Sequence, residues 1–228
     1  MSFFATADAS GSYSLTVWGY TVLILALIAV LLLGNFLFGR KKKFSAREIS
    51  FAAMAIALGT VSSMIKLFNM PMGGSVTLLS MLFIVLVGNW YGLGMGLSAG
   101  LAYGILQLLL GPYIISLPQM ICDYLLAFGA LGLSGLFAGS RNGLIKGYLL
   151  AVLGRYFFAV LSGVIFFGAY AEGVVFAGYD FSGRPLLYSL AYNGSYLLAE
   201  ALITILILAI PAVRRGLSRV RDLALGER

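Results

Sequence analysis

The apolar stretches of this chain are too long and too poor in charge for the interior of a water-soluble protein. Residues 75–111, for example, are apolar almost without a gap. The whole chain is 61% hydrophobic and 10% charged, whereas soluble globular domains contain about 25% charged residues. The apolar runs do not alternate with a period of two, as the strands of a membrane barrel would. The sequence therefore predicts an all-α integral membrane protein.

The residue types that are absent exclude several kinds of chemistry. The chain has no histidine and one cysteine, Cys122, so a disulfide within the chain, a metal site built on His or Cys and a His-containing catalytic triad are excluded. It also lacks a nucleotide-binding P-loop and a paired nucleophile and base. We therefore expect a protein that is not an enzyme and that binds no cofactor, metal or nucleic acid.

Basic residues next to the apolar runs set the expected topology. Arg40–Lys43 directly follow the first run, Arg141 and Lys146 lie in a short loop, and the segment RRGLSRVR follows the last run. Cytoplasmic loops of membrane proteins carry an excess of Lys and Arg. We therefore expect all three segments in the cytoplasm, the N-terminus outside and the C-terminus inside.

Seven spans fit this pattern, because each needs about 20 apolar residues. They are expected at residues 14–39, 45–67, the two parts of 75–111 divided near 88–92, 119–136, 147–170 and 185–213. Residues 1–44 then form an extra N-terminal transmembrane helix with a basic linker. Residues 45–228 form a six-helix core with a basic tail.

Three ionisable residues in the expected spans stand out: Asp123, Arg155 and Glu200. A charge at the bilayer centre costs about 2.5–3.5 kcal/mol on insertion scales and usually faces the bundle interior. Arg155 and Glu200 are expected at similar depths, so they either form a structural ion pair or have separate roles. Asp123 follows Gln119 by one turn and has no obvious charged partner, so it either opens on water or contacts a ligand.

The last span has a polar face, formed by Ser189, Asn193, Tyr196 and Glu200 at helical spacing. Such groups can simply hold helices together, at about 0.6 kcal/mol for each hydrogen bond. Asn193 and the neighbouring Tyr188 are expected at the depth of Asp123, where a binding site is the alternative. A carboxylate surrounded by aromatic rings suits a cationic ligand.

Four segments together resemble a known family. They read MPMGGSVTLLSMLF, GPYIISLPQMICDYLLAFGALGLSG, GRYFFAVLSGVIFFGAYA and LYSLAYNGSY. In this order and spacing they resemble the thiamine-specific S component of energy-coupling factor (ECF) transporters, over about residues 45–213. The resemblance implies a six-helix S-component bundle in the bacterial plasma membrane, which captures thiamine from outside. Uptake would then need a transmembrane coupling subunit and two ATPase subunits.

The resemblance also implies which residues bind and which dock. The loop FNMPMGGS, residues 68–75, corresponds to the lid over the substrate. The implied substrate contacts are Tyr113, Asp123, Gly163, Phe167, Tyr188 and Asn193. Ala53 and Ala57, in a stripe of small residues on the first core helix, correspond to the surface that docks the coupling subunit.

Two departures from the family pattern leave the ligand open. The chain has Ala159 where the family commonly has histidine, and Phe167 where it often has tryptophan. The alternatives are therefore an S component for a thiamine precursor or analogue, or for another vitamin. A stand-alone secondary transporter driven by ions, and a membrane scaffold without transport, are further alternatives from other functional classes.

Overall fold

The structure is a computed structural model that describes residues 5–7, 13–19, 21–22, 25, 44–70, 73–110, 113–176 and 178–226. Near the N-terminus, β1 (Ala5–Ala7) and β2 (Tyr13–Leu15) pair antiparallel. Most of the expected first span, residues 14–39, and the basic stretch Arg40–Lys43 lie outside the described residues. The expected core, residues 45–228, is described almost completely.

The first core helix, α2 (Ala46–Met64), begins at a capping box. Glu48 N–H donates to Ser45 Oγ at 3.2 Å, and Ser45 N–H donates to Glu48 Oε2 at 2.7 Å. These reciprocal bonds satisfy backbone donors that have no partner inside the helix. The helix start therefore agrees with the expected span at 45–67.

A short antiparallel hairpin follows α2 where a loop with Gly and Pro was expected. It consists of β3 (Lys66–Asn69) and β4 (Ser75–Thr77). Next come α3 (Ser80–Tyr91) and α4 (Leu93–Leu109). They are separated at Gly92, whose φ of 88° is readily adopted only by glycine. The expected break near residues 88–92 is thereby confirmed.

One continuous helical segment, Leu117–Phe137, changes its winding along its length. It runs through α5 (Leu117–Met120), a π-helical turn η2 (Ile121–Leu126), α6 (Ala127–Gly129) and a 3₁₀ segment η3 (Ala130–Phe137). The long helix α7 (Gly143–Phe166) packs against η3. A short turn η4 (Gly168–Ala171) and the hairpin β5 (Val175–Phe176) and β6 (Tyr179–Asp180) lead to the last core helix.

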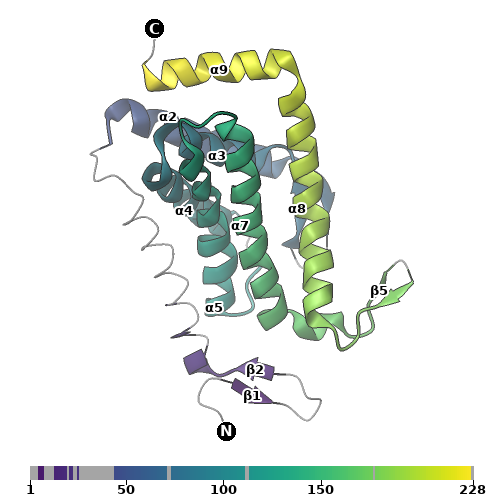
Figure 1. Cartoon of the computed structure of the whole chain (residues 1–228). Coiled ribbons are helices and arrows are strands. Elements are labelled where there is room, and N and C mark those ends of the chain that lie inside the picture. Colours follow the sequence, from purple (N-terminus) through teal and green to yellow (C-terminus); the bar gives the residue numbers. More distant parts are fainter. Residues whose placement is uncertain are drawn as a thin grey trace.

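That helix, α8 (Pro185–Ala209), is shorter than the expected span at 185–213. The chain turns at Ile210, and Pro211 begins a separate helix, α9 (Pro211–Leu225). Proline has no N–H to continue the preceding helix but suits the first turn of a new one. Figure 1 shows α9 running across the end of the bundle, opposite the end where α5 and β5 lie.

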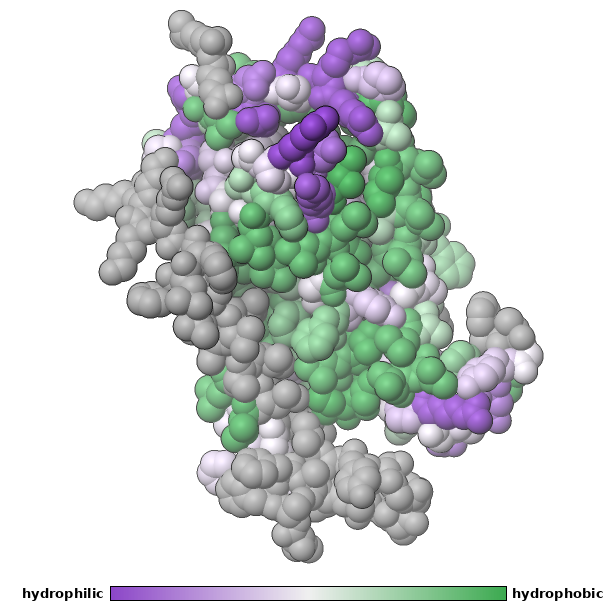
Figure 2. Space-filling model, in the orientation of Figure 1, coloured by the Kyte–Doolittle hydropathy of each residue, from purple (hydrophilic) through white to green (hydrophobic). Residues whose placement is uncertain are grey.

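The surface and the helix lengths agree with a membrane protein. Among the described residues, Leu117–Phe137, Gly143–Phe166 and Pro185–Ala209 are long and apolar enough to cross a membrane, and Ser80–Tyr91 and Leu93–Leu109 are shorter apolar helices. The face in Figure 2 is hydrophobic over the bundle and hydrophilic around α9. The core lies where α3, α4, η3 and α7 pack together.

Candidate functional site

A cavity of about 230 Å³ lies between the β3–β4 hairpin, α4, the loop before α5, η2, α7 and α8. One buried water needs only about 10–15 Å³ on this scale, so the cavity has room for a small molecule. All six residues implied as substrate contacts line it: Tyr113, Asp123, Gly163, Phe167, Tyr188 and Asn193. The structure thus brings together side chains that are up to 80 residues apart in the sequence. Their contact with a ligand stays a prediction.

Asp123 is held in the cavity wall by the π-helical turn and by Gln119. Gln119 Nε2 donates to Asp123 Oδ2 at 2.5 Å and to the carbonyl oxygen of Tyr113 at 3.1 Å, while Gln119 Oε1 accepts from Ile115 N–H at 3.1 Å. Gln119 is itself buried. A π turn displaces side chains from ordinary helical register and is frequent at functional sites. The second carboxylate oxygen of Asp123 accepts no hydrogen bond from the described residues.

The loop before α5 contributes Tyr113, whose ring lies against Phe167 with centroids 6.0 Å apart. Its backbone N–H donates to Tyr124 Oη at 2.8 Å, which fixes the loop on η2. Hydrogen bonding with Tyr170 raises the pKa of the Tyr113 phenol, and burial adds to this effect. The phenol therefore stays neutral at physiological pH and offers a hydroxyl group at the cavity.

Asn193 joins α8 to α7 in the opposite wall. Its Nδ2 donates to the carbonyl oxygens of Ala159 at 3.2 Å and Ser189 at 3.0 Å, and its Oδ1 accepts from Tyr196 Oη at 2.9 Å. The two helices approach closely at Gly163, because a Cβ there would overlap Ser189 Oγ. The polar face of α8 therefore both packs against α7 and lines the cavity. The two interpretations of its sequence, helix packing and a binding site, do not exclude each other.

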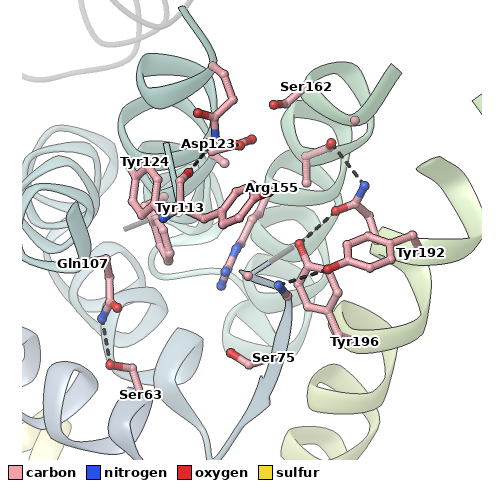
Figure 3. A pocket seen from close by; sticks show the side chains of 18 of the residues that line it. Ser63, Ser75, Gln107, Tyr113, Asp123, Tyr124, Arg155, Ser162, Tyr192 and Tyr196 are labelled. Atoms are coloured by element: carbon pink, nitrogen blue, oxygen red, sulfur yellow. Dashed lines mark hydrogen bonds between the residues drawn. The ribbon is translucent and has the colours of Figure 1, made fainter. Parts of the chain in front are cut away.

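Aromatic rings form much of the remaining wall. Tyr188, Tyr192 and Tyr196 follow one another along α8, with successive ring centroids 5.9 Å apart. Tyr192 Oη also accepts a hydrogen bond at 3.1 Å from the N–H of Gly74, in the hairpin. This bond ties the segment that corresponds to the expected lid to α8. Figure 3 shows Tyr192 and Tyr196 across the cavity from Tyr113, Asp123 and Tyr124.

Arg155 and Glu200 do not form an ion pair. Glu200 is buried, and its carboxylate accepts from Thr77 N–H and Oγ1, Ser80 Oγ and Met81 N–H at 2.6–3.3 Å. These four donors belong to β4 and the start of α3, so Glu200 anchors the base of the hairpin. Arg155 lies in the cavity instead, with its Cζ 4.2 Å from the ring centre of Phe128. The similar depth expected for Arg155 and Glu200 did not predict an ion pair correctly, because the two side chains face different neighbours.

Several lining residues were not predicted as site residues. Ser63 and Gln107 are joined by a 2.8 Å hydrogen bond between α2 and α4 and line the cavity with Lys66. Ser162 is buried there and has no hydrogen-bond partner among the described residues. The signal for Gln107 was a lone amide inside an apolar run. Ser63 was expected in a stripe of small residues on the first core helix, and it was given no role at a binding site.

Small residues on two sides of α2 have different environments. Ala53 and Ala57 are exposed, whereas Ala55 and Gly59 are buried in the bundle. Met54 and Leu58 beside them are 50% and 52% exposed. This face of α2 is therefore apolar and uncovered within the described chain, and docking at it stays a prediction.

Fold and site together define a helical membrane protein with a polar, aromatic-lined cavity inside its bundle. A family model described as thiamine transporter protein (Thia_YuaJ) matches residues 49–217. The chain is 35% identical to the thiamine transporter ThiT of Bacillus subtilis over 173 residues, which is 69% of this chain and 84% of that protein. It belongs to the thiamine transporter family.

Two further similar proteins are also named ThiT. The thiamine transporter ThiT of Lacticaseibacillus paracasei is 31% identical over 129 residues, covering 49% of this chain and 60% of that protein. A solved structure of ThiT from Listeria monocytogenes superposes with a TM-score of 0.60 at 27% identity, covering 75% of this chain and 96% of that chain. The resemblance seen in the sequence is confirmed, as is the expectation of a transport protein rather than an enzyme.

Proposed function

We propose that this protein is the thiamine-binding S component of an ECF-type importer in the bacterial cell membrane. The observation that carries the proposal is the meeting of Asp123 with aromatic side chains in one cavity. Thiamine combines a cationic thiazolium ring with an aminopyrimidine. A carboxylate forms charge-assisted hydrogen bonds with such an amine, and aromatic faces attract the cation.

Roles for the lining residues follow from their positions. Asp123 presents its free carboxylate oxygen to the aminopyrimidine. Phe167 and Tyr113, whose rings are tilted by 31°, offer faces to a flat ligand, and Tyr188 does so from α8. Asn193 and Gly163 hold the α7–α8 wall in place, and the remaining lone pair of Asn193 Oδ1 can accept from the ligand.

The proposal includes a topology and partners. Seven spans, with residues 1–44 as an extra helix before the core at 45–228, place the N-terminus outside and α9 in the cytoplasm. The hairpin and cavity then open to the outside. The exposed stripe of Ala53 and Ala57 docks the coupling subunit, which works with two ATPase subunits.

The test is calorimetric titration of the purified protein with thiamine, alongside its hydroxymethylpyrimidine half, riboflavin and biotin. We expect tight binding of thiamine, and loss of binding in Asp123→Ala and Asn193→Ala with the fold retained. Binding of the pyrimidine half but not of thiamine would favour an importer of a thiamine precursor. The two positions at which the chain departs from the family pattern, Ala159 and Phe167, both lie in the cavity wall. Unchanged affinity in both variants would refute the site.

The partner arrangement needs a separate test in proteoliposomes. We expect thiamine uptake only when the coupling subunit, the ATPase subunits and ATP are present. Uptake by the chain alone, driven by an ion gradient, would instead identify a secondary transporter.

A further inference from the structure

A second cavity, of about 500 Å³, lies at the other end of the bundle from α5, beneath α9. It is bounded by the end of α3, the loop before α7, the start of α7 and the inner side of α9. None of the residues assigned to the first cavity lines it. Its polar lining residues are Asn89, Ser140, Asn142, Arg214, Ser218 and Arg221.

The helix above this cavity is amphipathic and basic. Arg214, Arg215, Arg219 and Arg221 lie on α9 within two turns of one another. Its inner side is fixed to the bundle, because Tyr91 Oη donates to the carbonyl oxygen of Ala224 at 3.1 Å. The helix crosses the ends of the spans rather than continuing them (Figure 1). This orientation is that of a helix lying in a membrane interface.

The charge in the cavity is unbalanced. Arg214 and Arg221 line it, and no aspartate or glutamate is among the described lining residues. Arg214 uses Nε for the carbonyl oxygen of Leu208, at 2.6 Å, which leaves its other donors available. Arg221 makes no hydrogen bond or ion pair within the described chain. Two guanidinium groups facing one hollow favour an anion, and phosphate matches their forked geometry.

The start of α7 adds to the positive electrostatic potential in this cavity. Leu144 and Ile145, in its first turn, line the cavity, and the residue before the helix provides no side-chain cap. The N-terminus of a helix carries a partial positive charge that favours anions. The cavity and the two arginines define the site, and the helix start strengthens it.

The cavity also has an apolar lining, which includes Leu86, Leu144 and Leu217. Just below, Leu149 and Leu153 of α7 are 44% and 59% exposed, and the surface under α9 is hydrophobic (Figure 2). We propose that this cavity binds the phosphate headgroup of an anionic phospholipid, whose acyl chains lie along α7. Basic pockets at the boundary between spans and cytoplasm suit such headgroups. The site does not depend on the identity of the transported ligand.

The experiment measures thermal unfolding of the full chain in uncharged detergent micelles. The additives are dioleoyl-phosphatidylglycerol, dioleoyl-phosphatidylcholine or inorganic phosphate at equal concentration. We expect phosphatidylglycerol to raise the melting temperature more than the other two. Equal effects of the two lipids would overturn the proposal, and stabilisation by inorganic phosphate alone would assign the cavity to a soluble anion.

Two double variants on the same helix locate the effect. Arg214→Gln/Arg221→Gln removes the charges that line the cavity, and Arg215→Gln/Arg219→Gln removes the same charge outside it. We expect only the first to lose the additional shift with phosphatidylglycerol. Equal loss in both would overturn the site in favour of general attraction to a basic helix. Arg221→Gln alone, which breaks no hydrogen bond, gives the same comparison if the Arg214 change unfolds the corner between α8 and α9.

Discussion

Replacing Asp123 by asparagine removes one charge from the cavity proposed to bind thiamine and changes its shape very little. Gln119 donates to Asp123 Oδ2 at 2.5 Å, and the amide oxygen of asparagine can accept the same bond. The other oxygen, which accepts no hydrogen bond from the described residues, becomes an NH₂ group. A ligand amine that donated to the carboxylate then meets a second donor.

The size of the loss follows from that geometry. A hydrogen bond to a charged group contributes about 1.5–3 kcal/mol, and about 1.4 kcal/mol corresponds to a tenfold change in Kd. We therefore expect Asp123→Asn to weaken thiamine binding by about 10- to 150-fold. Calorimetry on the purified variant measures this directly, with the melting temperature in the absence of ligand as a check on folding.

A matched control is Asp180→Asn on the exposed hairpin strand β6. Hydrogen bonds from Ser182 hold the pKa of the Asp180 carboxyl below its usual value, so it is ionised at neutral pH and the control also removes one negative charge. We expect its Kd to match that of the unmodified protein. If Asp123→Asn bound thiamine within threefold of the unmodified protein, the carboxylate would not contact the ligand and our reasoning would be wrong.

Three further substitutions test the surroundings of the cavity. Gly163→Ala should weaken thiamine binding, because the new methyl group must displace Ser189 and shift the α7–α8 wall; calorimetry measures it. Glu200→Gln should lower the melting temperature, since each backbone or hydroxyl donor left without an acceptor costs about 1–3 kcal/mol and four donors meet this carboxylate. Tyr192→Phe loses the bond from Gly74 N–H, worth about 0.5–1.5 kcal/mol; ligand dissociation, followed by stopped-flow fluorescence, should accelerate about 2- to 12-fold.

Each has a control on an exposed part of the chain. Gly216→Ala lies on α9 with open space around it and should leave binding unchanged. Glu172→Gln loses only an exposed acceptor and should melt near the unmodified protein. Tyr179→Phe removes a hydroxyl from the β5–β6 hairpin and should leave dissociation unchanged. Equal effects in a variant and its control would contradict the corresponding explanation.

Helix positions were predictable where local signals were strong. The break near residues 88–92 was expected because residues 75–111 are too long for one span, and the structure places a positive φ at Gly92. The last span was predicted four residues too long, because hydrophobicity continues through Ile210 and Val213 although Pro211 begins a new helix. The β3–β4 hairpin was expected only as a loop, since two very short strands leave almost no periodic pattern.

The site residues were predictable only in part, and by way of the family resemblance. Asp123 and Asn193 stand out in the sequence because hydrogen-bonding groups are costly in lipid. Their convergence with Gly163 and Phe167 in one cavity is a property of how α7 packs against η2 and α8. Glu200 shows the limit of reasoning from depth alone, because its partners come from β4 and α3 rather than from Arg155.

The sequence by itself determined that this is a helical membrane protein, because its low charge and long apolar runs leave no other way to satisfy the backbone in lipid. It also singled out the polar groups that need partners. Only the tertiary structure decided which partners they have. Side-chain hydrogen bonds act over about 3 Å, so they depend on which helix faces meet, and that depends on close approaches such as the one at Gly163.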